Sequence, residues 1–436
     1  MIAAVAVWLV LAAIILTTWP RSRAWRAGLP LVAVAFALLQ QLIFATVPDR
    51  AFVTFRYAGN IAAGNGAVFN IGERHEDYSN FAWLVLVTLP KALFGADVVR
   101  GAVVLSVACA LGCVLLAHRF GPLAGVLTAA ASGLAAYECA GTETPLFVLL
   151  VLAVLYAVLT RHPVAAGVLA ALAMMTRPDG LALAIAAALW LATTAARRRS
   201  NWWAPGGYVL ALLVVAVPWL AWRATYYDQP LLTWPATEMS VTAYAFLLAA
   251  LFAVVVTRLL ARHRRPSPVP RRSSRWVPVA ALVLCGLSLP VAANERATVL
   301  GWRDRLAQTA EIGSWLAARL PAGAVISTGA AALAYGVGYH MVVLTGDQHN
   351  EARDDDDVEY VATLRRPALV TGSSLGYGTA QKCVAGPDVA GSYEVATFHR
   401  EGYDEWVTVY PRDDEAAGLI RRLDGDPRLA YVPCPG

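Results

Sequence analysis

The residues with the most chemical capacity lie in the segment 48–80, between two apolar stretches. Asp49 directly follows an apolar run. A carboxylate held beside a membrane surface can act as a general base toward a hydroxyl group, although the same residue could simply end a helix and face water. A dense set of polar and aromatic side chains follows, with donors and acceptors that suit sugar hydroxyls and guanidinium groups that suit phosphate. The members of this set are Arg50, Arg56, Tyr57, His75, Tyr78 and Asn80.

Two later segments carry charges at the ends of apolar runs. The sequence CAGTETPLF at 139–147 places Glu143 just before such a run, and MTRPDG at 175–180 places Arg177 and Asp179 between two of them. A charge near the bilayer centre costs ~2.5–3.5 kcal/mol on insertion scales, and charges at span boundaries cost less. We predict that Arg177 holds an anionic phosphate there. A plain interfacial ion pair between Arg177 and Asp179 is the alternative.

The elements that position these residues are predicted to be membrane helices. The chain has 436 residues, of which 58% are hydrophobic and 15% charged, against about 25% charged in a typical soluble domain. An ordinary soluble enzyme is therefore excluded. A helix needs ~20 apolar residues to span a membrane, and about ten stretches approach this length. They are 2–19, 28–47, 100–117, 122–137, 145–160, 163–175, 180–196, 206–222, 241–260 and 277–292. The shorter segment 81–95, with Pro90 and Lys91, is predicted to be an interfacial helix.

The distribution of charge predicts the topology of the chain. The chain has a net charge of +5, and its basic residues cluster in connections between apolar runs that contain no Asp or Glu. The positive-inside rule places these connections in the cytoplasm. The segment 48–80 and the C-terminal part then lie outside, so the basic residues indicate topology and no nucleic-acid partner is expected. The first apolar run lacks a basic leader and a small-residue cleavage site, so a removable signal peptide is not expected.

We predict two domains, a membrane domain at 1–293 and a small extracytoplasmic α/β domain at 294–436. In the second domain a helical stretch at 302–320 alternates with β-like runs at 324–327, 341–344, 368–371 and 406–410. The acidic run 354–357 is interpreted as a solvated loop, and the D-x-D match at 424–426 as a turn. Cys383 and Cys434 lie where a disulfide is permitted, and the sequence leaves their pairing open.

Three motifs in the first outer segment resemble a known family. They are D-x-A-F-V-T-F-R-Y-A-x-N from Asp49, G-N-G-x-V-F-N-x-G-E from Gly64, and Y-S-N-F-x-W from Tyr78. Together with GTETPLF and TRPDG they resemble the GT-C superfamily of membrane glycosyltransferases. They are most similar to the actinobacterial terminal arabinofuranosyltransferases of cell-wall arabinan.

The resemblance implies a polyprenyl-phosphate sugar as donor, a bacterial cytoplasmic membrane, and an acceptor hydroxyl on an extracytoplasmic glycan or glycolipid. Asp49 takes the position of the catalytic carboxylate in an inverting transfer. Arg56, His75 and Tyr78 would line the donor or acceptor site, and Arg177 would lie in its outer wall. Glu143 and Asp179 would complete that wall.

The chain departs from the family pattern at two places. Arg50 stands where relatives commonly have a second acidic residue, and no Pro-Asn-Thr segment follows Tyr226 and Tyr227. Arg50 could weaken Asp49 as a base or could bind phosphate instead. A polyprenyl phosphate is already a good leaving group, so one base with cations on the phosphate is sufficient.

Two other classes of function remain open. The first is a non-catalytic assembly or sensor protein of the same fold, in which Arg50 would indicate that the catalytic chemistry has been lost. A transporter would place ionisable residues at the membrane midplane, whereas the charges here lie at span ends. No His/Cys cluster with metal-ligand spacing is present in the sequence, so we expect no metal centre of that kind, no cofactor is assigned, and a requirement for a divalent metal stays open.

Overall fold

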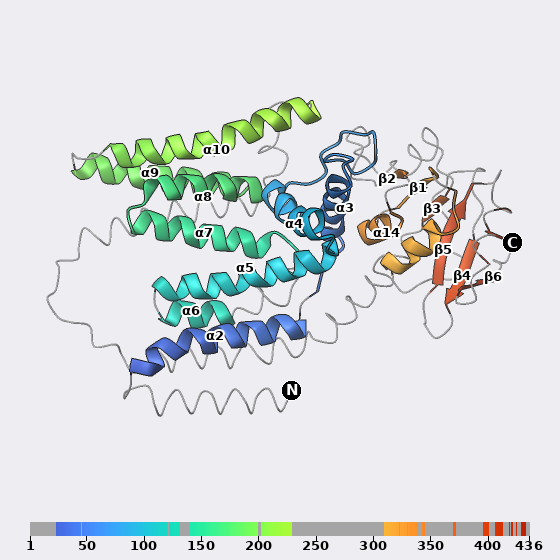
Figure 1. The fold of residues 1–436 in the computed structure, drawn as a ribbon, viewed down its shortest axis with the longest axis horizontal. Helices are drawn as coiled ribbons and strands as arrows, with labels where there is room; N and C mark the ends of the chain where they lie inside the picture. Colours follow the sequence, from blue (N-terminus) through green and yellow to red (C-terminus); the bar gives the residue numbers. More distant parts are fainter. Residues whose placement is uncertain are drawn as a thin grey trace. The chain divides into compact units, whose positions relative to one another are not determined.

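The computed structural model is mostly helical in the part of the chain that it describes (Figure 1). The residues described are 23–44, 46–120, 122–130, 140–198, 202–228, 309–321, 323–328, 330–338, 342–344, 369–371, 396–400, 406–412, 418, 420–421, 424 and 429–432. The chain divides into two compact units, here called the helical unit and the sheet unit. The helical unit is Met1–Val47, Ser79–Val87 and Val99–Gly301, and the sheet unit is Pro48–Tyr78, Thr88–Val98 and Trp302–Gly436.

Most predicted apolar stretches coincide with helices. The helices outside the segment 48–78 and before residue 229 are α2 (Arg23–Phe44), α4 (Phe81–Phe94), α5 (Val98–Phe120), α6 (Pro122–Ala130), α7 (Thr144–Leu159), α8 (Pro163–Thr176), α9 (Gly180–Arg198) and α10 (Trp203–Tyr227). The predicted helix at 81–95 is confirmed as α4, and the stretch 122–137 begins on α6. The predicted spans 2–19, 241–260 and 277–292 lie outside the described residues.

Two of the described helices, α5 and α10, are long and apolar enough to cross a membrane. The helices α4, α7 and α8, and the apolar part of α9, have a similar composition but are shorter than 18 residues. The expectation of about ten membrane spans therefore stays a prediction.

Small residues set the packing of the helical unit. Helix α8 packs between α7 and α10, as Figure 1 shows. A Cβ atom added at Gly167 of α8 would lie 2.3 Å from the carbonyl oxygen of Tyr208 on α10, so only glycine permits this approach. The Tyr208 hydroxyl is buried and donates a hydrogen bond of 2.9 Å to the carbonyl oxygen of Ala184 on α9. These contacts bring three helices together at one level.

The outer segment 48–80, predicted as a loop, contains the helix α3 (Ala51–Ala62). Its sequence AFVTFRYAGNIA has no proline and only one glycine, and nine of its twelve residues are buried. The chain leaves the helix through Gly64, which has a φ of 84° that suits glycine. The polar motif residues 56, 57 and 60 thus project from a helix rather than from an irregular loop.

A mixed six-stranded sheet forms the other part of the sheet unit. Its strands are β1 (Val325–Ser327), β2 (Val342–Leu344), β3 (Leu369–Thr371), β4 (Ala396–Arg400), β5 (Trp406–Pro411) and β6 (Leu429–Val432), in the order β2-β1-β3-β5-β4-β6. Strand β1 pairs in parallel with β2 and β3, and the remaining pairs are antiparallel.

The described residues confirm much of the predicted pattern after position 300. Strands β1, β2, β3 and β5 coincide with the four predicted β-like runs, whereas β4 and β6 were not predicted. Residues 309–317 are helical, inside the predicted stretch 302–320, and a short helix α14 (Ala331–Gly336) follows β1. The predicted boundary between 293 and 294, the run 354–357, Cys383 and Cys434 lie outside the described residues.

Candidate functional site

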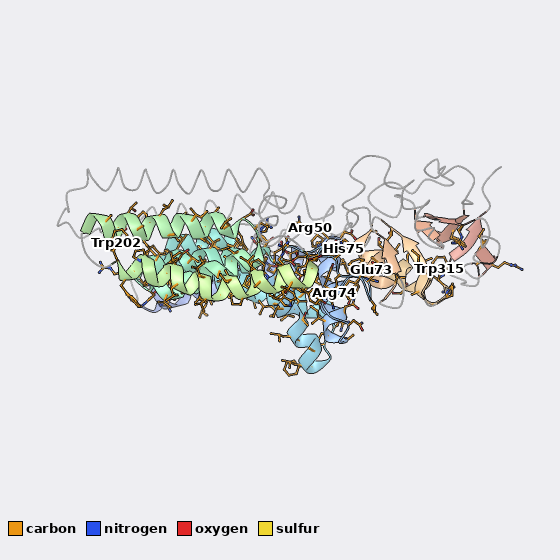
Figure 2. All side chains as sticks on the ribbon, turned by 90° about the horizontal axis from the view of Figure 1, so that it is seen from above. Arg50, Glu73, Arg74, His75, Trp202 and Trp315 are labelled. Atoms are coloured by element: carbon orange, nitrogen blue, oxygen red, sulfur yellow. The ribbon has the colours of Figure 1, made fainter. Side chains whose placement is uncertain are left out.

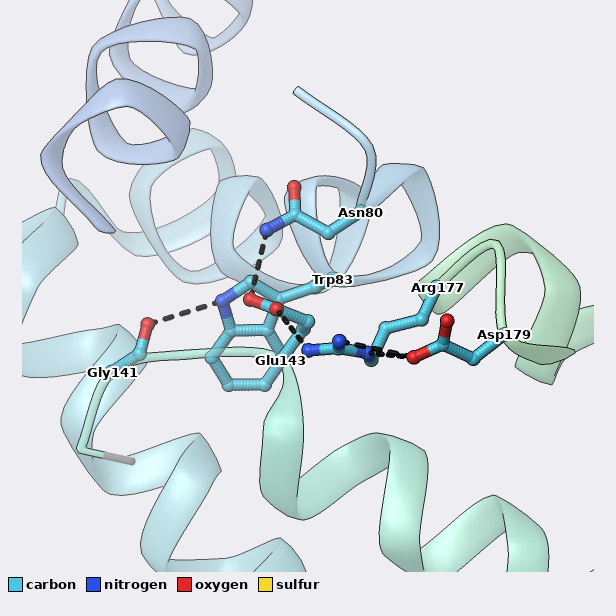
Figure 3. A network of polar contacts seen from close by, with 6 residues as sticks. All are labelled: Asn80, Trp83, Gly141, Glu143, Arg177 and Asp179. Atoms are coloured by element: carbon cyan, nitrogen blue, oxygen red, sulfur yellow. Dashed lines mark hydrogen bonds and ion pairs between the residues drawn. The ribbon is translucent and has the colours of Figure 1, made fainter. Parts of the chain in front are cut away.

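A network of polar contacts in the helical unit joins three segments that are distant in the sequence (Figure 3). The Arg177 guanidinium contacts Glu143, with 3.3 Å between Nη1 and Oε1, and Asp179, with 3.0 Å between Nη2 and Oδ2. The other oxygen of Glu143, Oε2, accepts a hydrogen bond of 3.1 Å from the Asn80 side-chain amide. The structure therefore brings together Glu143, Arg177 and Asp179, which were predicted to form one wall of a site, and adds Asn80, another predicted site residue, to them.

Local sequence explains how α8 and α9 present this pair of charges. Pro178 disfavours a helical conformation in the residue before it, and Arg177 is extended, with φ −153° and ψ 143°, directly after α8. A Cβ atom at Gly180 would lie 2.4 Å from the carbonyl carbon of Ala173, so glycine allows α9 to start against α8. The TRPDG motif is thus a tight connection that projects Arg177 and Asp179 to the same side.

The opposite side of the network is fixed by a buried tryptophan. Trp83 on α4 is fully buried and its indole N–H donates a hydrogen bond of 3.1 Å to the carbonyl oxygen of Gly141. Gly141 has a φ of 74° and precedes Glu143, the residue before the first turn of α7. Trp83 was not among the predicted site residues, although the Y-S-N-F-x-W motif contains it. An aromatic residue with a polar N–H beside a predicted site is a signal that could have identified it.

The network contains one more negative charge than positive charge. Two carboxylates, Glu143 and Asp179, surround one guanidinium, and the side chains are 16%, 13% and 31% exposed, respectively. A guanidinium has five N–H groups, and three of those of Arg177 contact these carboxylates. Within the described residues, two N–H groups of a partly exposed Arg177 thus remain for a ligand.

In the sheet unit, Asp49 contacts the first turn of α14. Its Oδ2 accepts a hydrogen bond of 2.9 Å from the backbone N–H of Ala331, and its Oδ1 accepts one of 2.8 Å from that of Ala332. These are N–H groups that a helix cannot satisfy internally. Asp49 is partly exposed, but both of its oxygens bind the protein, so it does more than end a helix and face water.

Arg56 lies at the other end of α14. Its side chain is fully buried, and its guanidinium donates to the carbonyl oxygens of Phe69 (2.9 Å), Gly338 (2.8 Å) and Ala334. A weaker contact of 3.4 Å joins it to the Asn70 side chain. This saturation by protein acceptors corrects the expectation that Arg56 lies open to a donor or acceptor.

Two asparagines of the first two motifs also bind groups of the protein. The Asn60 side-chain amide donates to the carbonyl oxygens of Val68 and Phe69, at 2.8 Å and 3.0 Å. Asn65 donates to the Asn60 side chain at 3.0 Å. These asparagines hold the segment after α3 against the helix.

The predicted residues Tyr57, His75 and Tyr78 lie together in the sheet unit. Tyr57 is fully buried, and its hydroxyl lies 2.7 Å from the carbonyl oxygen of His75 and 2.9 Å from Oδ2 of Asp77. The rings of Tyr57 and Tyr78 meet edge to face with centroids 4.9 Å apart. The side chains of Arg50 and His75 are exposed (Figure 2). Asp77, which the prediction omitted, is therefore a partner of the buried tyrosine.

No group of three or more His, Cys, Asp or Glu side chains that could hold a metal ion occurs among the residues that the structure describes.

No protein-family model matches the sequence, and a comparison with curated proteins finds no match. A comparison with solved structures finds the crystal structure of ArnT from Cupriavidus metallidurans bound to undecaprenyl phosphate. The two chains are 13% identical, the match covers 91% of this chain and 99% of that chain, and the TM-score is 0.45. Neither value is high enough to assign a fold or a function to this chain.

Proposed function

We propose that the protein is a GT-C-type membrane glycosyltransferase that takes a sugar from a polyprenyl-phosphate carrier. The transfer goes to a hydroxyl group of an extracytoplasmic glycan or glycolipid, and arabinofuranose is the favoured sugar. One observation carries the proposal: the motif segments around Asn80, Glu143 and Arg177, singled out from the sequence alone, meet in a single network.

Aromatic residues on α10 support a position of this network at a membrane surface. Trp202 (Figure 2) and Trp203 are 63% and 69% exposed at the start of the helix. Trp222 and Tyr226 stack near its end. Twenty residues separate Trp202 from Trp222, or about 30 Å of helix, which matches the hydrocarbon thickness of a bilayer. Tryptophan and tyrosine favour both interfaces.

Phe81 connects the charged network to the aromatic residues near the end of α10. Its ring lies 5.0 Å from that of Trp222 and 6.1 Å from that of Trp219, between centroids. Phe81 directly follows Asn80, which contacts Glu143. The charged network therefore lies near the depth at which the phosphates of lipids are found.

Arg177 is the proposed ligand of the donor phosphate. Glu143 and Asp179 hold its guanidinium in place, and two N–H groups remain for phosphate oxygens, a geometry that lysine cannot reproduce. Arg56 is not assigned to the phosphate, because its side chain is buried and bound to backbone carbonyls.

Asp49 is the proposed general base. An ionised carboxylate offers about four acceptor positions, and the contacts with Ala331 and Ala332 use two of them. In the proposed step the acceptor oxygen bonds to the anomeric carbon as the bond from that carbon to the phosphate oxygen breaks. The acceptor proton passes to Asp49 and polyprenyl phosphate leaves, so the configuration inverts.

The contacts of Asp49 also favour a second candidate, a non-catalytic assembly or sensor protein of the same fold. In such a protein Asp49 would serve only to hold α14, and the carrier lipid would bind without turnover. The two candidates differ in chemistry and not in ligand.

The test uses purified protein, radiolabelled decaprenyl-phosphate arabinose and a short arabinan acceptor. Transfer by the wild type is expected, together with a loss of at least about tenfold in Arg177→Lys. Arg161→Lys, an exposed arginine of the same unit, is the matched control. Wild-type donor affinity in Arg177→Lys would refute the phosphate role, and donor binding without any transfer would favour the non-catalytic protein.

Asp49→Asn requires a second measurement. Asparagine offers one acceptor oxygen where Asp49 uses two, so the variant loses a structural contact as well as a base. Transfer must therefore be expressed per folded molecule, with folding followed by thermal unfolding. Full transfer by folded Asp49→Asn would exclude Asp49 as the base.

A further inference from the structure

We propose that Arg56 is a positioning residue for the Asp49 carboxylate and acts on it through α14. The inference rests on the proposed function, because it takes Asp49 to be the base. Asp49 binds the backbone N–H groups at the start of α14, and Arg56 binds the carbonyl oxygens of Ala334 and Gly338 at its end. One short helix is thus held at both ends by one neighbouring segment.

The spacing of the two residues fits the length of the helix that they hold. Asp49 lies in the turn two residues before the start of α3 and Arg56 lies within that helix, and their separation of seven residues corresponds to about 10.5 Å at the helical rise. Helix α14 has six residues, or about 9 Å. A carboxylate on the N–H end and a guanidinium on the carbonyl end also complement the helix dipole. Both side chains can therefore bind α14 at once without distortion of either helix.

Apolar contacts keep α14 beside α3 between these two ends. The Tyr335 ring lies 5.6 Å from that of Phe52 and 6.3 Å from that of Phe55, between centroids. A Cβ atom added at Gly336 would lie 2.1 Å from the carbonyl oxygen of Ala310, so the helix at 309–317 closes on the other side. Helix α14 has little room to move as long as its ends stay bound.

Arg56 is suited to this role by its fixed shape. The guanidinium is planar and directs its N–H groups along fixed lines, and here it joins the end of α14 to the carbonyl oxygen of Phe69. A lysine ammonium is a single point that cannot reach both groups. Arg56→Lys should therefore release the end of α14 while it keeps the positive charge.

The consequence for Asp49 is a fixed orientation. Two N–H donors from adjacent residues hold both oxygens at 2.9 Å and 2.8 Å, so the plane of the carboxylate cannot rotate freely. A general base works only when its lone pair is aimed at the proton that it removes. When α14 shifts, the base is still present but misdirected, which lowers kcat and leaves donor binding intact.

The first variant that tests this is Arg56→Lys, with Arg319→Lys as the matched control. Arg319 is a partly buried arginine of the same unit that donates to the carbonyl oxygen of Trp315. The second variant is Ala331→Pro, which deletes one N–H donor to Asp49. Ala330 before it has φ −102° and ψ 113°, a conformation allowed before proline, and proline is favoured at the first position of a helix.

Two readouts are needed, namely steady-state transfer and amide hydrogen exchange of peptides that cover α14. We expect kcat to fall roughly ten- to a hundredfold in Arg56→Lys and Ala331→Pro, with the donor KM within about twofold of wild type. Exchange at α14 should be faster in Arg56→Lys and unchanged in Arg319→Lys. An unchanged kcat in both test variants, measured on folded protein, would overturn the inference.

Failure of the proposed function is recognised separately. If the wild type transfers no sugar, the exchange data alone decide whether Arg56 controls α14. Faster exchange of the Ala331 and Ala332 amides in Arg56→Lys would support the positioning of Asp49 by Arg56, and exchange equal to that of Arg319→Lys would refute it.

Discussion

Substitution of Gly167 by alanine is expected to separate α8 from α10. The added Cβ atom would lie 2.3 Å from the carbonyl oxygen of Tyr208, 3.0 Å from the Ala211 side chain and 3.1 Å from the backbone nitrogen of Leu212. Two of these three atoms belong to the backbone, so no side chain can rotate away. The helices must move apart by roughly 1 Å to restore an ordinary contact, and overpacking of this kind costs ~1–3 kcal/mol.

Gly206→Ala is the matched control for this prediction. Gly206 lies in α10, the helix that Gly167 of α8 contacts, but nothing lies within 4 Å of a Cβ atom added at Gly206. Both variants gain helix propensity of up to about 1 kcal/mol, so the difference between them isolates the close contact. Thermal unfolding in detergent should place Gly167→Ala below Gly206→Ala by the equivalent of ~1–3 kcal/mol. Equal midpoints would refute the close approach of α8 and α10.

The same displacement should reach the charged network. Arg177 directly follows the last residue of α8 and comes ten residues after Gly167, which is about 15 Å along the helix axis. A shift of α8 moves Arg177 relative to Glu143, which precedes α7, and should weaken donor binding in Gly167→Ala and not in Gly206→Ala.

Three further substitutions test single contacts. Glu143→Gln leaves one oxygen for two donors, and thermal unfolding should show a loss of about 1–2 kcal/mol, since the partly exposed Arg177 reduces the worth of the pair; an unchanged midpoint would contradict the network. Trp83→Phe keeps the ring in a buried position but leaves the Gly141 carbonyl oxygen without its donor, at an expected cost of ~1–3 kcal/mol in chemical denaturation. Tyr57→Phe removes the buried hydroxyl, so amide exchange of residues 75–77 should become faster, and protection equal to wild type would show that the hydroxyl does not hold this segment.

The features of the candidate site that could be predicted are those determined by residues close together in the sequence. Pro178 and Gly180 determine the connection between α8 and α9 through the backbone conformations that they favour or permit, so TRPDG could be interpreted as an interface turn. Apolar runs likewise predicted the helices, because their composition alone excludes a soluble surface. The contact between Arg177 and Asp179 had been given as the alternative to a phosphate site, and the structure contains this ion pair.

The contacts that Asp49 and Arg56 make with α14 could not be predicted, because these partners lie far away in the sequence. The N–H groups that bind Asp49 are 282 and 283 residues away, and the carbonyl oxygens that bind Arg56, in α14 and directly after it, are 278 and 282 residues away. These partners are backbone atoms, and no side-chain pattern reveals them. Asn60 of the first motif likewise binds backbone atoms, the carbonyl oxygens of Val68 and Phe69, and the motif does not show this.

Arg56 and its hydrogen-bond partner Gly338 are 282 residues apart in the sequence, and this separation has a consequence for the synthesis of the protein. Translation at ~5–20 residues per second leaves about 14–56 s between the appearance of Arg56 and that of Gly338. Throughout this interval the guanidinium that ends fully buried has no α14 to bind. Helix α3 therefore reaches its final packing only after most of the chain has been synthesised, and a ribosome that stalls before Gly338 leaves a nascent chain with this segment open to proteases.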